Sequence, residues 1–507
     1  MLKKLKRVLS SDWFIVLAVF VLAVGIRTIP EIKAGIWPIG YDTFNTYAAE
    51  LATYQGSLWN FLKTANILYI IFWPFKLLGL QPDLIIKIFG PILYGFLSIS
   101  FWVFVRRYLK FSKLQAVLAT LLVIFQLASL RISWDLYRNE LGLIFLFLAL
   151  VNLPKISQTK NLIFFAIFAC LVGLSNELVT VLLMVILLVY WFYLFKRRQW
   201  YFLTALSIPL VAIIIIFIIV LNSSGQILYD PHIYFTYENN YIWRYFYEYH
   251  KVMSYDQLFQ TITGLFWLLF QFLLPFALYG FWFLRKNLVL TTMTLWLLIG
   301  TFSSLFFAGK GILVWERWLV MLAFPLAIYA IYGIFQLGAI LAKPKLWTQR
   351  FPKLALILAI IFWAGYFSLF LFRAIPFVSA SYPDAKPPLA NEKINIYFPR
   401  TMVHNSVGIW KIEYTLDCVQ WLNQNAPAGS VVLVDNRFRG LILTRFNLDG
   451  RYIITNPWSE KSPEANLMLA RKKGLAPIYL IWNTLKSIDG FDRFYSSGNM
   501  GVYKALP

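Results

Sequence analysis

One carboxylate in this sequence is notable for the loop that surrounds it. Asp42 lies in Gly40-Tyr41-Asp42-Thr43, after an apolar stretch that ends near residue 29 and a series of prolines and glycines that break the chain. A carboxylate in such a loop could act as general base towards an acceptor hydroxyl or could bind a divalent cation. It could also cap a helix that begins at Thr43. The loop alone leaves these roles open.

A second polar segment, residues 134–140 (WDLYRNE), interrupts the apolar sequence further on. Asp135 and Glu140 could hold an acceptor or a metal, and a possible divalent cation would then lie between Asp42 and Asp135. Arg138 could pair with a phosphate. The alternative is a capped turn with aromatic residues at the membrane interface.

Four further ionisable residues lie beside apolar segments. Glu177 follows Asn176, so a helix cap and the positive helix end explain it as well as a role in acceptor or metal binding does. Arg244, Lys310 and Arg317 are surrounded by aromatic residues. They could anchor the protein at lipid headgroups, or together they could bind the phosphate of a lipid-linked donor.

The composition indicates what positions these residues. The chain has 507 residues, is 60% hydrophobic and only 14% charged, with a mean hydropathy of +0.66, whereas soluble domains have about 25% charged residues. We therefore predict an α-helical multi-pass membrane protein with about 11 transmembrane helices. The expected spans are residues 13–29, 84–105, 114–130, 139–153, 161–175, 177–195, 203–221, 258–283, 288–308, 317–341 and 354–375.

The net charge of +23 has a pattern that argues against nucleic acid as a partner. Short breaks dense in Lys and Arg alternate with polar segments of balanced charge, which is the positive-inside pattern. It predicts a cytoplasmic N-terminus and puts Asp42 and the other candidates on the outer face of the cell membrane. The chain has two cysteines and three scattered histidines, which excludes a cysteine-rich zinc site.

Two domains are expected. Residues 1–376 form the transmembrane domain, with a large first outer loop at 30–83 whose apolar piece, 67–80, we interpret as re-entrant or interfacial. Prolines after residue 376 mark a linker. Residues 377–507 have ordinary polarity and predict a small extracytoplasmic α/β domain. Its expected helices are 413–425 and 463–473, and its expected strands are 431–434, 452–454, 478–482 and 502–505.

These features together resemble the GT-C superfamily of integral-membrane glycosyltransferases, which includes oligosaccharyltransferases, protein O-mannosyltransferases and aminoarabinose transferases. The likeness rests on the acidic motif Gly40-Tyr41-Asp42, on the second motif at 134–140, on the many spans and on the outer C-terminal domain. Arg317, in the segment 315–318 (WERW), resembles a basic residue that some members carry late in the chain. The architectural resemblance covers nearly the whole sequence, whereas its motifs are short.

The resemblance implies a polyprenyl-phosphate-linked sugar as donor, membrane lipid as surroundings, and Asp42 as the catalytic residue that acts on an acceptor hydroxyl. The chain departs from the family because no second acidic residue stands beside Asp42. The Trp-Trp-Asp-Tyr-Gly motif of oligosaccharyltransferases is also absent, which argues against transfer of a whole oligosaccharide. Two alternatives remain, a flippase or transporter of lipid-linked glycans and a polymerase or ligase of surface polysaccharide.

Overall fold

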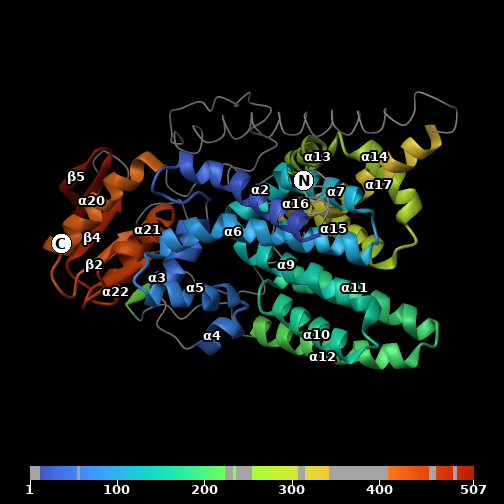
Figure 1. Ribbon diagram of the computed structural model, residues 1–507. Coiled ribbons are helices and arrows are strands. Elements are labelled where there is room, and N and C mark those ends of the chain that lie inside the picture. The colour runs from blue at the N-terminus through green and yellow to red at the C-terminus, as the bar shows by residue number, and fades with distance from the viewer. Residues whose placement is uncertain are drawn as a thin grey trace, which may run out of the picture.

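The computed structural model describes residues 12–40, 42–53, 58–222, 232–235, 254–306, 315–341, 409–455, 464–482 and 488–506. Within these ranges the protein is mostly helical. A bundle of long helices makes up one part of the molecule, and a mixed sheet with its own helices lies at one end of that bundle (Figure 1).

Six helical segments of the described chain are long and apolar enough to cross a membrane, or up to eight if each of two bent pairs counts as one span. These segments are α2 (Asp12–Lys33), α6 (Pro82–Val103, extended to Tyr108 by the π-helical η2), α11 (Glu177–Lys196), α12 (Trp200–Asn222), α15 (Leu288–Phe306), and α16 (Trp315–Met321) continued by α17 (Ala323–Leu341). The prediction of about 11 spans is thus not confirmed. Two of the expected spans form helices of only 16 and 15 residues, α9 (Tyr137–Asn152) and α10 (Thr159–Gly173). The expected span at 354–375 lies outside the described residues.

The two bent pairs are predicted above as single helices. The region 114–130 divides into α7 (Lys113–Ile124) and α8 (Leu127–Asp135), which meet at 61°. Tyr94 donates from its hydroxyl to the Ile124 carbonyl at 2.9 Å, and the Gln126 side chain accepts from the Leu127 amide. These bonds replace helix bonds that the bend removes. The other pair, α13 (Tyr255–Phe270) and α14 (Leu274–Leu284), meets at 83°, with Pro275 in the first turn of α14.

The loop predicted at residues 30–83 contains short helices. They are η1 (Thr43–Ala48, a π-helix), α3 (Ala49–Thr53), α4 (Leu58–Lys63) and α5 (Ile67–Leu77). The 11 residues of α5 span only about 16 Å at 1.5 Å per residue, too short for a bilayer. Helix η1 packs against α6, so the long span α6 supports the segment that follows Asp42.

The C-terminal part is a six-stranded sheet in the order β1-β3-β2-β4-β6-β5. Its strands are β1 (Ile233–Phe235), β2 (Val431–Val434), β3 (Tyr452–Thr455), β4 (Ile478–Trp482), β5 (Phe491–Ser497) and β6 (Met500–Ala505). Its helices are α20 (Ile409–Asn425), α21 (Asn436–Arg445) and α22 (Glu464–Lys472). The first four strands in that order pair in parallel, and β6 and β5 add two antiparallel strands.

The predicted α/β pattern of this domain agrees with the strands β2, β3, β4 and β6. Three elements were not expected. Helix α21 and strand β5 carry polar residues on much of their surface and lack a clear apolar period. Strand β1 comes from the long loop between α12 and α13, and it pairs with β3. The sheet is therefore completed by a segment that lies about 200 residues before the other strands in the sequence.

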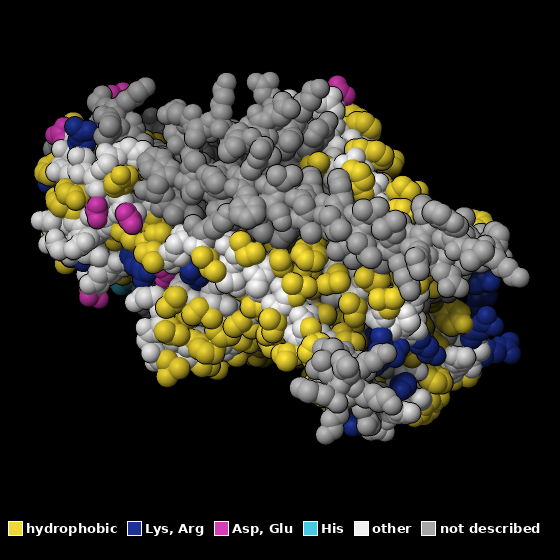
Figure 2. Space-filling model, turned by 45° about the horizontal axis from the view of Figure 1, so that its top comes forward, with side chains coloured by type: hydrophobic (Ala, Val, Ile, Leu, Met, Phe, Trp, Pro, Cys, Tyr) yellow, Lys and Arg dark blue, Asp and Glu magenta, His cyan; other side chains and the backbone are white. Residues whose placement is uncertain are grey.

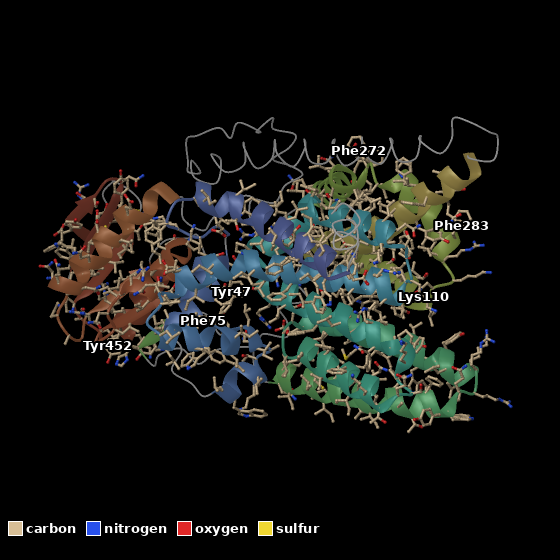
Figure 3. The ribbon with its side chains drawn as sticks, viewed as in Figure 1. Tyr47, Phe75, Lys110, Phe272, Phe283 and Tyr452 are labelled. Carbon is tan, nitrogen blue, oxygen red and sulfur yellow. The ribbon has the colours of Figure 1, made fainter. Side chains whose placement is uncertain are left out.

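Charge is distributed unevenly along the molecule. Dark blue Lys and Arg side chains gather at the end away from the sheet, and a broad hydrophobic surface lies between the two ends (Figure 2). Figure 3 labels Lys110 and Phe283 at this basic end and Tyr452 in the sheet at the other. Lys110, in one of the breaks dense in Lys and Arg, thus lies at the end of the molecule opposite the C-terminal domain.

Candidate active site

Asp42 and Arg317 lie side by side, although the sequence places them in separate loops. Asp42 directly precedes η1, and Arg317 is in the first turn of α16. The Asp42 Oδ2 atom is 3.8 Å from Nη2 of Arg317, and their side chains are 28% and 30% exposed. A carboxylate and a guanidinium therefore share one partly open location at the end of the bundle that carries the C-terminal domain.

A second arginine, Arg131, adds to this location. It lies on α8, which packs against α16, and its side chain is only 8% exposed. Arg131 interacts electrostatically with both Asp42 and Arg317. Arg131 is not among the site residues predicted from the sequence, although it lies one helical turn before Asp135. That spacing on one helix face was the signal that could have identified it.

Helix η1 contacts α9 through two residues that follow Asp42, Thr43 and Tyr47. The Thr43 hydroxyl donates to the Ile39 carbonyl at 2.6 Å and lies 3.5 Å from the Tyr137 hydroxyl. The Tyr47 hydroxyl accepts the backbone N–H of Arg138 at 3.4 Å, and the Tyr47 ring packs edge-on against Tyr137. Burial raises the pKa of Tyr47, so this phenol stays neutral and serves as a hydrogen-bonding group. The backbone beside Asp42 is thereby ordered.

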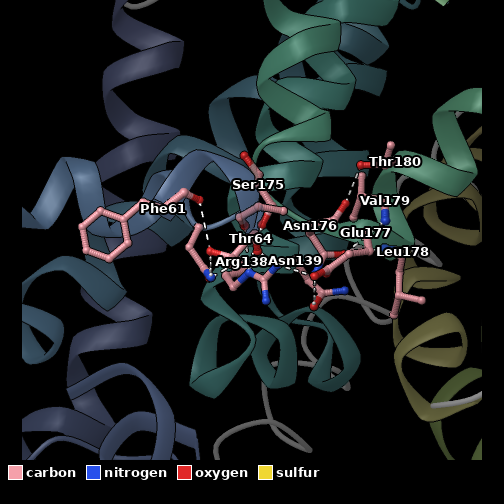
Figure 4. Close-up of polar contacts among 12 residues, drawn as sticks. Phe61, Thr64, Arg138, Asn139, Ser175, Asn176, Glu177, Leu178, Val179 and Thr180 are labelled. Carbon is pink, nitrogen blue, oxygen red and sulfur yellow. Dashed lines mark hydrogen bonds and ion pairs between the residues drawn. The ribbon is translucent and has the colours of Figure 1, made fainter. Parts of the chain in front are cut away.

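Arg138 is held by several polar contacts (Figure 4). Its Nη2 atom is 2.6 Å from Oε1 of Glu177, and its Nε atom donates to the carbonyls of Ala65 and Ser175 at 3.0 and 3.2 Å. Asn176 caps α11 by accepting two backbone N–H groups, as the sequence suggested. Arg138 and Glu177 thus join the first loop to α9 and α11.

A group of charged residues on α2, α6 and α9, most of them buried, was not predicted from the sequence. The Nη1 atom of Arg27 is 2.8 Å from Oε1 of Glu31, and Lys87 reaches Oε2 of the same carboxylate at 3.4 Å. Arg27 also donates from Nε to the Ser133 carbonyl at 3.0 Å. Glu140 is fully buried and interacts electrostatically with Arg27. The structure therefore groups Glu140 with Arg27, whereas the sequence analysis placed it at an open acceptor or metal region.

Another carboxylate, Glu50, lies on α3 beyond η1. Its Oε2 atom accepts a short hydrogen bond from the Tyr69 hydroxyl. Burial raises the pKa of Glu50 from its ordinary 4.5 to about 7, which the hydrogen bond from Tyr69 opposes. The positive charges of Arg138 and Arg439 also lower it, and the negative charge of Asp42 raises it. Glu50 is therefore a second titratable group near Asp42, which the sequence analysis did not consider.

The structure does not describe several of the site residues predicted from the sequence. Arg244 and Lys310 lie outside the described residues, and so does the side chain of Asp135, the last residue of α8. Among the residues described, no group of three or more His, Cys, Asp or Glu side chains could hold a metal ion. Among the described side chains, Asp42 pairs with Arg317, which is a cation and not a metal ligand. A cation between Asp42 and Asp135 stays a prediction.

The chain is similar in fold to solved structures of an oligosaccharyltransferase from Archaeoglobus fulgidus. One, a complex with Zn and sulfate, has a TM-score of 0.52 and 13% identity over 91% of this chain and 67% of that chain. Another, the apo form, has a TM-score of 0.49 and 13% identity over 92% and 69%. No family model matches the sequence, and the comparison with curated proteins finds no match. The likeness to the zinc complex shows the fold.

Proposed function

We propose that this protein is a membrane glycosyltransferase that moves a sugar from a polyprenyl-phosphate-linked donor to an acceptor hydroxyl at the outer face of the cell membrane. One observation carries the proposal, the close approach of Asp42 to Arg317 with Arg131 beside them. Transfer from a phosphate-linked sugar needs a carboxylate for the incoming hydroxyl and cations for the departing phosphate. The fold likeness to an oligosaccharyltransferase supports the same reaction class.

In the proposed reaction, the acceptor oxygen attacks the anomeric carbon while the bond from that carbon to the phosphate oxygen breaks. Asp42 takes the hydroxyl proton, and the bonding electrons leave with the phosphate. Arg317 and Arg131 stabilise the negative charge that develops on the leaving group. Lys310 and Arg244 stay in the proposed phosphate-binding set. Arg138 does not, because its guanidinium already binds Glu177 and two carbonyls.

The location of the charged residues favours a transferase over a flippase. A transport path needs polar groups through the depth of the helices. The buried ions Arg27, Glu31 and Glu140 instead lie near those ends of α2 and α9 that adjoin the Asp42 loop. We therefore place the chemistry at the outer ends of the helices.

The experiment that tests this function uses the protein in lipid vesicles with a panel of radiolabelled polyprenyl-phosphate sugars. Release of sugar from the lipid and movement of intact lipid between leaflets are followed together. Asp42→Asn removes the base with little change in shape. Asp12→Asn is the matched control, because Asp12 pairs with Lys113 at the basic end.

Sugar release by the wild type and by Asp12→Asn, but not by a folded Asp42→Asn variant, supports the proposal and identifies the donor. Movement of intact lipid without release contradicts it and points to a flippase. Repeated addition to a growing glycan, instead of a single transfer, points to the polymerase alternative.

A further inference from the structure

Helix α21 of the C-terminal domain lies against the segment that carries Asp42. It packs on both η1 and α3. A single hydrophobic core joins Trp37 and Ala49 of the first loop to Phe438 and Leu441 of α21. Since η1 also packs on α6, it lies between a membrane helix and a helix of the C-terminal domain. The two domains therefore share a core around η1.

An ion pair links the end of α21 to the start of α6. Arg445, the last residue of α21, places Nη2 2.7 Å from Oδ2 of Asp83 in the first turn of α6. Its Nη1 atom donates a short hydrogen bond to the Gln81 side chain. The Arg445 carbonyl in turn accepts the Asn423 side-chain amide at 3.1 Å, which ties the end of α21 to α20. Arg445 thus connects the C-terminal domain directly to the start of α6.

Asp83 depends on this arginine. Its side chain is 8% exposed, and its Oδ1 atom hydrogen-bonds to no described residue. Breaking a buried pair by removing one partner is costly, because the remaining charge stays desolvated. The Asp83–Arg445 pair therefore stabilises the packing of α21 on η1.

From these contacts we propose that Asp83 and Arg445 are positioning residues, which lock α21 onto η1 and so fix Asp42 for reaction. The proposal rests on the proposed function for its catalytic consequence. It makes the C-terminal domain a part of the active site. Loss of the Asp83–Arg445 ion pair lowers kcat, because Asp42 is displaced. The donor KM stays unchanged, because Arg131 and Arg317 still bind the phosphate.

The test compares the full-length wild type with Arg445→Gln, Asp83→Asn and the double variant in lipid vesicles. Backbone hydrogen exchange in residues 43–53 reports on η1 and α3 independently of activity, and sugar release gives kcat and KM. Arg471→Gln is the control. Arg471 is also in the last turn of a helix of this domain, but it binds the Leu506 carbonyl.

We expect Arg445→Gln to raise the rate of backbone hydrogen exchange in residues 43–53 by at least about tenfold and to lower kcat by a similar factor. The reason is that the substitution leaves the buried Asp83 carboxylate without its cation. The donor KM should stay within about twofold. The double variant should exchange more slowly than Arg445→Gln, because no charge is left unpaired. Arg471→Gln should match the wild type.

Unchanged exchange in Arg445→Gln overturns the proposal whatever the activity. Raised exchange with unchanged kcat overturns the positioning role. If the wild type releases no sugar from any donor, the proposed function and the catalytic consequence both fail, and hydrogen exchange then decides whether the Asp83–Arg445 pair orders η1.

Discussion

Arg317 Nη2 lies 3.8 Å from the carboxylate of Asp42, across the junction between the first outer loop and the late helix α16. The distance corresponds to an ion pair that remains partly open, as both side chains are about one third exposed. A phosphate could therefore approach the guanidinium without displacing buried groups. Under the proposed function, the base and the phosphate ligand would therefore lie next to each other.

Replacement of Arg317 by glutamine should lower kcat/KM for sugar release by about 10²- to 10³-fold, since a preorganised donor to the leaving group is lost. Arg317→Lys should retain part of the activity, because it keeps the charge but not the planar fork. Initial rates with a single labelled donor measure the effect. Full activity of Arg317→Gln would contradict its assignment to the phosphate.

Arg131 should act on the same phosphate as Arg317. We expect Arg131→Gln to lower the rate, and we expect the double variant with Arg317→Gln to lose less than the product of the single losses. A double-mutant cycle on kcat/KM measures this coupling. Arg285→Gln serves as control, since Arg285 lies over the Trp282 ring at the basic end. Independent, fully multiplicative losses would show that Arg131 acts elsewhere.

The Arg138–Glu177 pair should matter for stability. Arg138→Gln should lower the free energy of unfolding by about 3 kcal/mol, because it leaves the buried Glu177 carboxylate without its 2.6 Å partner. Arg138→Gln combined with Glu177→Gln should be more stable than Arg138→Gln alone. Thermal unfolding in detergent measures both. An Arg138→Gln variant as stable as the wild type would leave the arginine available for the donor after all.

Glu50 should give the protein a pH dependence. Its pKa is raised by burial to about 7 in the folded protein against an ordinary 4.5, so the folded state binds more protons than the unfolded state between these values. Stability from this group is therefore present below about pH 4.5 and is lost as the pH rises through about 7. Unfolding temperatures of wild type and Glu50→Gln, measured across this range, check the prediction. The slope difference should vanish if Glu50 titrates normally.

Two glycines should be required where α14 meets α17. A Cβ atom on Gly280 would lie 1.9 Å from the Tyr329 carbonyl oxygen, and one on Gly333 would lie 2.2 Å from that of Phe276. Either alanine substitution should separate the helices and lower the unfolding temperature. Gly25→Ala in α2 is the control, because a Cβ there meets no atom within 4 Å. Equal stability of all three variants would contradict this close packing.

The sequence predicted the membrane class and the strands β2, β3, β4 and β6, and it offered a helix after Asp42 as one of several alternatives. Long apolar runs and alternating patterns are local properties, so they can be recognised without knowing the neighbours. The single helix predicted at 114–130 was wrong, because α7 and α8 meet at a bend. The Tyr94 hydrogen bond that accommodates this bend comes from another helix, so the local sequence does not reveal it. The count of about 11 spans is not confirmed, and two of the expected spans form helices of only 16 and 15 residues.

Which charged side chains lie close together depends on the tertiary structure. It brought Arg317 and Arg131 to Asp42, moved Arg138 into a network with Glu177, and placed α21 over η1. Each of these contacts joins residues far apart in the chain, and no periodicity encodes such pairs. The candidate site is set by where the helix ends meet, which depends on the packing of the whole bundle and on the domain that covers it.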